Sequence, residues 1–190
     1  MDLSVIVYLA LLALVGLLRL VELRISRRHQ RDLFSRGVEK RADPQFRWMV
    51  ALHTVVLCGA AIEVVALHRP FLPDLAAPMT VLFALATSLR WWVIHTMGAH
   101  WNVEVLASGP LGVVTTGPFR WVRHPNYLAV FVELVALPLI HTAWITALIA
   151  AAGNVWVLRH RLRVEEPVLD ANPAYRAAMS GKPRFLPKLF

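Results

Sequence analysis

The chain has 190 residues, of which 57% are apolar and 17% are charged, and its mean hydropathy is +0.55. Soluble domains average about 45–50% apolar and about 25% charged residues, so this composition excludes both an ordinary soluble domain and a disordered chain. The formal net charge is +8 and the pI is near 10.8, which in a soluble protein would indicate nucleic-acid binding. In a membrane protein such charge collects in cytoplasmic loops instead.

The first predicted membrane segment covers residues 3–23. We favour a membrane helix over a secretory signal peptide, because no basic residue precedes the apolar run and no small-residue cleavage site follows it. Within the segment, Arg19 and Glu22 lie three residues apart and can pair on one helix face. Residues 24–47 are polar and basic, so the segment is expected to leave the membrane near Leu23.

Two further membrane helices are predicted at residues 46–67 and 75–97, each long enough for a bilayer core about 30 Å thick. Asp43-Pro44 is a cap and first-turn signal for the first of them. The single cysteine, Cys58, lies inside this helix, which excludes an internal disulfide and favours a small buried apolar side chain. Residues 98–126 are less apolar and contain two Gly-Pro turn signals, so we expect a connection packed against the bundle.

The apolar stretch from Tyr127 to Leu158 is too long for one membrane helix, since a single helix would extend about 48 Å. Pro138 and the polar pair that follows it predict a break, giving helices at 127–138 and 142–165 in a tight hairpin. The first of these is too short to cross alone and is expected to pack inside the bundle or tilt. Asn172-Pro173 then predicts a short last helix that ends by Gly181.

The distribution of positive charge predicts the topology. The stretches 24–47, 98–126 and 159–190 hold 17 of the 20 Lys and Arg residues. Five membrane segments place these three stretches on one side, which the charge bias identifies as the cytoplasm. The basic charge is then topological, with some contact to anionic lipids and no nucleic-acid partner. Three tryptophans are expected near the cytoplasmic interface: Trp48, Trp101 and Trp121.

The predicted fold is therefore all-α, a polytopic integral membrane protein forming a single domain over residues 1–190. Polar groups gather near the cytoplasmic ends of the last two membrane helices. Arg161 and Glu165 share one helix stripe with Asn154 and Leu158, and Asn126 and Glu133 share a stripe on the preceding helix. Because ionisable groups inside a membrane tend to face a partner or a wet cavity, this pattern predicts a polar pocket open to the cytoplasm.

Each of these polar groups also has a structural interpretation that the sequence leaves open. His124 can be a helix cap or an interfacial side chain, Glu165-Glu166 can form a solvated ion-pair face, and Glu133 can pair with Arg90. We predict no metal site, because no set of ligands converges at a suitable spacing. Three histidines are expected to be interior or interfacial residues: His53, His95 and His141.

A resemblance to a known family arises from one motif and the residues that follow it. The motif is Gly117-Pro118-Phe119-Arg120 followed by Arg123-His124-Pro125-Asn126-Tyr127, then the apolar hairpin, Arg161, Glu165-Glu166, Tyr175 and Pro183-Arg184-Phe185-Leu186-Pro187. In this order the residues resemble the isoprenylcysteine carboxyl methyltransferase (ICMT) family over roughly residues 85–187. The stretch Leu89–Val103 resembles a small bacterial branch that includes proteins similar to alkylpyrone and alkylresorcinol O-methyltransferases.

The resemblance implies S-adenosylmethionine as the cofactor, held in a pocket of the methyltransferase core at residues 75–190, with 1–70 supplying membrane helices. His124, Pro125 and Tyr127 match residues that line the cofactor, and Glu165 and Glu166 match the acidic pair that closes it. Arg161 matches an arginine near the cofactor and the substrate head group. The implied catalytic residues are Arg161, Glu165 and His124.

The implied reaction is methyl transfer to an oxygen of a lipophilic or prenylated acceptor among membrane lipids. A carboxylate acceptor needs no base at pH 7, whereas a phenol or enol would use His124 or Glu165. The alternatives are a phospholipid N-methyltransferase, an NADPH-dependent sterol-type reductase and a non-enzymatic scaffold or small transporter. Neither the acceptor nor the oligomeric state is predicted.

Overall fold

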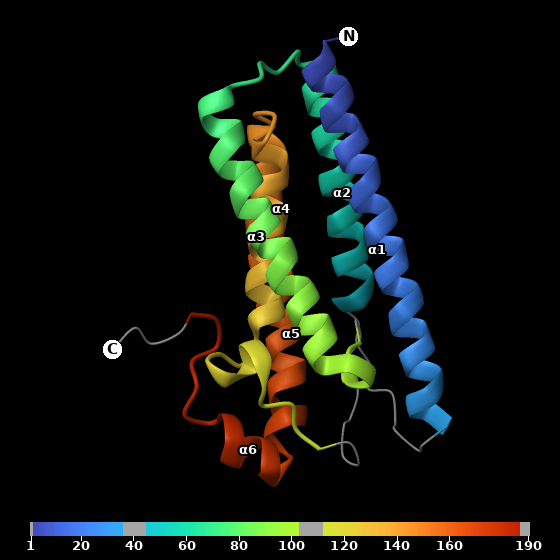
Figure 1. Cartoon of the computed structure of the whole chain (residues 1–190), viewed down its shortest axis with the longest axis vertical. Helices are drawn as coiled ribbons and strands as arrows, with labels where there is room; N and C mark the ends of the chain where they lie inside the picture. Colours follow the sequence, from blue (N-terminus) through green and yellow to red (C-terminus); the bar gives the residue numbers. More distant parts are fainter. Residues whose placement is uncertain (1, 36–44, 103–111, 187–190) are drawn as a thin grey trace.

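The computed structural model describes residues 2–35, 45–102 and 112–186, which form α-helices and two short 3₁₀ helices without any strand in these ranges. Five longer helices make an antiparallel bundle (Figure 1). Helix bounds are α1 Leu3–Ser35, α2 Gln45–Ala66, α3 Pro73–Met97, η1 Gly98–His100, η2 Gly117–Arg120, α4 Pro125–Leu139, α5 Trp144–Asp170 and α6 Pro173–Met179. The all-α prediction is confirmed, and the Asp43-Pro44 cap lies outside the described residues.

Three helices, α1, α2 and α3, are long and apolar enough to cross a membrane. Helix α4 is apolar but has 15 residues, about 22 Å of helix, which is short for a bilayer core of about 30 Å. Eight of its residues are buried, so α4 lies inside the bundle against α3 and α5, as predicted from its length. The chain is a polytopic membrane protein whose shortest apolar helix is shielded by the others.

The turn between α4 and α5 is built where the sequence predicts the break. Pro138 lies in the last turn of α4, and Thr142 adopts a left-handed backbone conformation with φ 55°. Glu63 of α2 then caps α5 from outside, accepting hydrogen bonds from the amides of Ile145 at 3.1 Å and Thr146 at 2.8 Å. Because the first amides of a helix lack intrahelical partners, this carboxylate fixes the α4–α5 hairpin against α2.

Four charged residues join α1, α3 and α4 in what we call the charge cluster: the partly buried Arg19 and the buried Glu22, Arg90 and Glu133. Arg90 Nη2 lies 2.5 Å from Glu22 Oε2, and Arg19 Nη1 lies 3.2 Å from the same oxygen. Glu133 Oε2 accepts from Arg19 at 3.4 Å and lies 3.7 Å from Arg90. Both predicted pairs, Arg19 with Glu22 and Arg90 with Glu133, are therefore present.

Helix α1 is the main departure from the predicted elements, because it continues to Ser35 instead of ending near Leu23. Its 33 residues correspond to about 50 Å, well beyond the thickness of a bilayer core. The buried residues Glu22, Ser26 and Leu33 follow helical spacing along this extension, so its inner face packs against the protein. The basic composition of residues 24–35 indicated a loop, whereas the row of buried residues along one face of this segment supports a helix.

Several smaller expectations are also settled. Asn172 caps α6 as predicted, since its Oδ1 accepts from the amides of Ala174 and Tyr175. Cys58 was expected to be buried, and this was wrong: its side chain is exposed on the outer face of α2. Helix α5 also runs past its predicted end at residue 165 to Asp170, with Pro167 inside its last turn.

Candidate functional site

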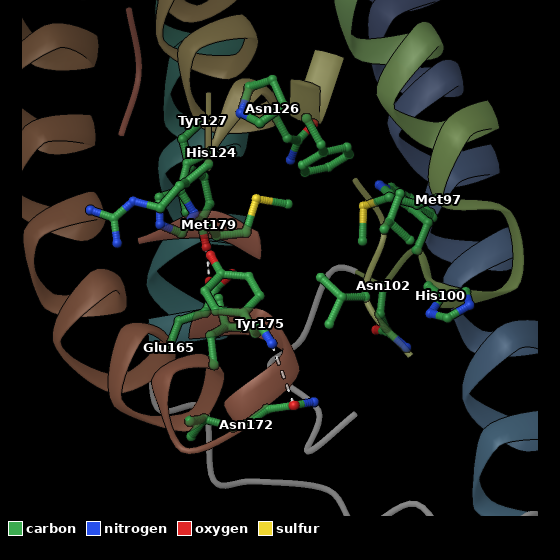
Figure 2. A pocket seen from close by; sticks show the side chains of 18 of the residues that line it. Met97, His100, Asn102, His124, Asn126, Tyr127, Glu165, Asn172, Tyr175 and Met179 are labelled. Carbon is green, nitrogen blue, oxygen red and sulfur yellow. Dashed lines mark hydrogen bonds between the residues drawn. The ribbon is translucent and has the colours of Figure 1, made fainter. Parts of the chain in front are cut away.

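A cavity of about 190 Å³ opens at the end of the bundle where α3 ends and α4 begins (Figure 2). Figure 2 shows His124, Tyr127 and Glu165 on one side of it and Met97, His100 and Asn102 on the opposite side. Its lining comes from α1, the end of α3, the start of α4, α5 and α6, including Leu33, Trp101, Asn126, Arg161, Asn172, Tyr175 and Met179. The predicted pocket therefore exists, and its lining residues come from segments between Leu33 and Met179.

A tight turn before α4 brings the motif residues to the cavity. Gly117 has φ +55°, and a Cβ on it would lie 2.5 Å from the hydroxyl oxygen of Thr96, so both conformation and space require glycine there. Pro125 occupies the first turn of α4, where its missing amide hydrogen costs nothing. His124 is the N-cap residue of α4, as one interpretation of the sequence allowed, but its side chain makes no capping hydrogen bond.

Tyr127, Arg161 and Glu165 form one connected group on the cavity wall. Arg161 Nε donates to the Tyr127 hydroxyl at 2.7 Å, and this hydroxyl donates to Glu165 Oε2. Arg161 Nε also lies 3.5 Å from Glu165 Oε2, one helical turn along α5, and its guanidinium lies 5.7 Å from the Tyr127 ring centroid. The wall thus presents a cation, a carboxylate and an aromatic face within one hydrogen-bonded unit.

The imidazole of His124 stacks on the Tyr127 ring, with centroids 5.4 Å apart and an interplanar angle of 26°. Its Nε2 donates to Glu166 Oε1 at 3.3 Å. Burial lowers the pKa of His124, and the nearby Glu165 and Glu166 carboxylates oppose this shift without reversing it. The imidazole is therefore neutral at pH 7, with its Nε2–H directed to Glu166.

Glu166 occupies a different place from the one predicted for it, since it is absent from the cavity lining while Glu165 is part of it. Its carboxylate faces the C-terminal segment and forms a bidentate ion pair with Arg184, at 2.8 and 2.6 Å. The backbone of the same segment accepts from Arg123 N at 2.9 Å and from His124 N at 2.8 Å. Glu166 therefore holds His124 from behind the cavity wall.

Burial alone would raise the pKa of Glu166, but the ion pair with Arg184 outweighs it and holds this pKa below its usual value. A lowered pKa in the folded state contributes stability above pH 4.5 that is lost as the pH falls through the folded value. Arg184→Ala should therefore lower the thermal unfolding midpoint at pH 7, and the deficit should shrink between pH 5 and pH 3. The exposed Arg176→Ala is the control, and a deficit independent of pH would contradict the assignment.

Two polar residues of the predicted stripes, Glu133 and Asn154, do not line the cavity. Glu133 was expected to face the pocket with Asn126, but it belongs to the charge cluster, where Thr87 also donates to it at 2.9 Å. Asn126 does line the cavity. Trp101 was expected at the membrane interface, yet it is 2% exposed and forms part of the cavity wall.

Sequence reasoning missed Leu33 and Met179 as cavity residues, and gave Asn172 and Tyr175 no role in lining it. The cap motif at Asn172 was a signal that the chain turns back at this point. No comparable signal marked Leu33, because an apolar residue in a basic stretch has no distinctive pattern. Among the described residues, no group of three or more His, Cys, Asp or Glu side chains could hold a metal ion.

Comparison with known proteins agrees with the family resemblance of the part of the chain that carries the motif. Residues 79–171 match the isoprenylcysteine carboxyl methyltransferase (ICMT) family. The uncharacterized protein YpbQ of Bacillus subtilis (strain 168) is 23% identical over 160 residues, covering 84% of this chain and 95% of the relative. An uncharacterized protein of Haemophilus influenzae is 26% identical over 154 residues, covering 80% and 89%.

Proposed function

We propose that this chain, as a member of the isoprenylcysteine carboxyl methyltransferase family, is a methyltransferase with a lipophilic acceptor. Its residues 79–171 match the family, and the reaction we propose is transfer of a methyl group from S-adenosylmethionine to an oxygen of that acceptor. The family is one of membrane methyltransferases, and the apolar helices fit that setting. The observation that carries the proposal is the cavity wall on which His124, Tyr127, Arg161 and Glu165 meet.

The residues of the cavity fit this cofactor chemically. The sulfonium is a cation, which suits the aromatic face of Tyr127. Arg161 suits the carboxylate of the amino-acid part, and Glu165 can accept from its ammonium or from ribose hydroxyls. Asn126 adds a second indication: its buried Oδ1 has no hydrogen-bond partner among the described residues, so a donor on a bound ligand would satisfy it.

When bound, S-adenosylmethionine supplies an activated methyl group. Arg161 and Glu165 would bind and orient the polar groups of the cofactor, while Tyr127 holds these two side chains in register by hydrogen bonding to both. For a phenol or enol acceptor, Glu165 or the neutral His124 is the group that takes the hydroxyl proton. A carboxylate acceptor is already ionised at pH 7 and needs only the positioning.

The position of the site supports a membrane-soluble acceptor. Two pairs of half-exposed tryptophans lie near it, Trp92 with Trp121 and Trp48 with Trp156, each with ring centroids 5.9 Å apart. Tryptophan concentrates where the bilayer meets water, so the cavity lies close to the headgroup level. We propose that the end of the bundle that holds the cavity lies on the cytoplasmic side of a bacterial membrane. The described basic residues at the end of α1 and in the second half of α5 lie at this end, as the charge bias of cytoplasmic segments predicts.

The test uses the full-length protein in detergent micelles. Isothermal titration is expected to show saturable binding of S-adenosylmethionine and no heat from NADPH. Radiolabelled methyl transfer is then screened with a long-chain alkylphenol, a prenylated cysteine with a free carboxylate, and phosphatidylethanolamine. We expect an O-methyl product from one of the first two. Binding of NADPH alone would indicate a reductase, and methylation of phosphatidylethanolamine alone would indicate a phospholipid N-methyltransferase.

A further inference from the structure

The end of α1 contacts the cavity wall that lies opposite His124 and Glu165. Along its last turns, the inner face carries Ser26, which is fully buried, and Leu33, which is 2% exposed and lines the cavity. The exposed face of the same turns carries Arg24, Arg27, Arg28 and Arg31. The extension is thus two-sided, with its charge turned outward and its small polar and apolar residues turned to the protein.

Three hydrogen bonds join this inner face to the segment that follows η1. His29 Nδ1 donates to the carbonyl oxygen of Trp101 at 2.9 Å. Asn102 Oδ1 accepts from Ser26 Oγ at 2.8 Å and from Gln30 Nε2 at 2.9 Å. Ser26 and Gln30, one helical turn apart on α1, therefore fix the side-chain oxygen of Asn102, and His29 holds the backbone carbonyl of the residue before it.

The wall held in this way differs in chemistry from the wall around Glu165. It includes the apolar and aromatic side chains of Leu33, Met97 and Trp101, beside the polar side chains of His100 and Asn102. Among the described residues of this wall there is no Lys or Arg to bind an amino-acid carboxylate, whereas an apolar acceptor body would contact Leu33, Met97 and Trp101.

We propose that the inner face of the α1 extension is part of the active site and that Ser26, His29 and Gln30 on this face are positioning residues for the acceptor-binding wall. This inference rests on the proposed function and deepens it, because it divides the cavity between its two ligands. Asn126, Tyr127, Arg161 and Glu165 serve the cofactor. Leu33, Met97 and Trp101 receive the lipophilic acceptor, and α1 sets their distance from the cofactor side.

The test compares a double variant, Ser26→Ala with Gln30→Ala, against wild type. Both changes remove donors to Asn102 and leave the cofactor wall untouched. We expect KM for the methylated probe, the alkylphenol or the prenylated cysteine, to rise about tenfold. Binding of S-adenosylmethionine should stay within twofold, and the thermal midpoint should fall only slightly. The matched control is Arg27→Ala with Arg31→Ala, also four residues apart but on the exposed face, which should leave KM unchanged.

The outcomes separate the two proposals. An unchanged KM in the double variant, with methyl transfer intact in the wild type, overturns the role of α1 and leaves the proposed function standing. An equal loss of cofactor binding and acceptor binding also overturns it, because that result means general loosening of the pocket. If the wild type binds no S-adenosylmethionine and transfers no methyl group, the proposed function fails and the inference fails with it.

Discussion

Arg161→Ala is expected to weaken binding of S-adenosylmethionine at least thirtyfold. Arg161 is 6% exposed and supplies the cation of the connected group on the cavity wall. Its Nε donates a hydrogen bond to the Tyr127 hydroxyl and lies 3.5 Å from Glu165 Oε2. Its loss leaves the Glu165 carboxylate facing an anionic ligand group without a counter-charge. Truncating one partner of a buried charged contact costs about 2 kcal/mol or more, which corresponds to about thirtyfold in Kd.

Three comparisons make the Arg161 result interpretable. Arg161→Gln retains most of the volume without the charge and should show the same loss, which separates charge from packing. Arg161→Lys keeps the charge but lacks the planar fork, so an intermediate Kd is expected. Arg159→Ala removes an exposed arginine from the same helix and should leave Kd unchanged. Full binding by Arg161→Gln would remove Arg161 from the cofactor side of the cavity.

The hairpin and the motif around it could be predicted because their signals are local. Pro138 ends α4 within a turn, the Asn172-Pro173 pair starts α6, and the four-residue spacing of Arg161 and Glu165 puts both on one face of α5. These features depend on backbone sterics and helix periodicity, which act within a few residues. They predicted a pocket near one end of the bundle, and the cavity lies at that end.

The role of the two adjacent glutamates could not be predicted, because it depends on long-range partners. Successive residues on a helix point about 100° apart, so Glu165 and Glu166 cannot both face one cavity. Which of them does so is decided by Arg184, which comes 18 residues later and draws Glu166 to the opposite side. The sequence shows the acidic pair but not the direction in which each carboxylate points.

The extension of α1 illustrates the same limit for a whole element. Its arginines indicate a polar loop, and its inner stripe of Ser26, His29 and Gln30 becomes meaningful only once Trp101 and Asn102 supply the other half of each hydrogen bond. A helix that leaves the membrane is stabilised by such tertiary contacts more than by its own propensity. The N-terminal half of the chain was therefore expected to supply membrane helices alone.

Glu22→Gln is expected to destabilise the protein by about 3–5 kcal/mol, because it breaks a buried ion pair by removing one partner. Glu22 is 2% exposed and balances both Arg90 and Arg19 in the charge cluster. The neutral amide leaves the buried Arg90 and the partly buried Arg19 with Glu133 as the one remaining carboxylate of the cluster. Titration with a denaturing detergent, followed by circular dichroism, measures the loss. The exposed Asp74→Asn should change the free energy of unfolding by less than about 0.5 kcal/mol.

The double variant Glu22→Met with Arg90→Met tests whether charge balance is the cause. It removes one residue of each sign and leaves Arg19 paired with Glu133 at 3.4 Å, so the cluster remains neutral. Replacing a complete buried ion pair by apolar residues of similar volume is often close to neutral, whereas breaking one is costly. The double variant should therefore be more stable than Glu22→Gln. If it is less stable, by the sum of two independent losses, the cluster stabilises the bundle through shape and packing and its balance of charge is incidental.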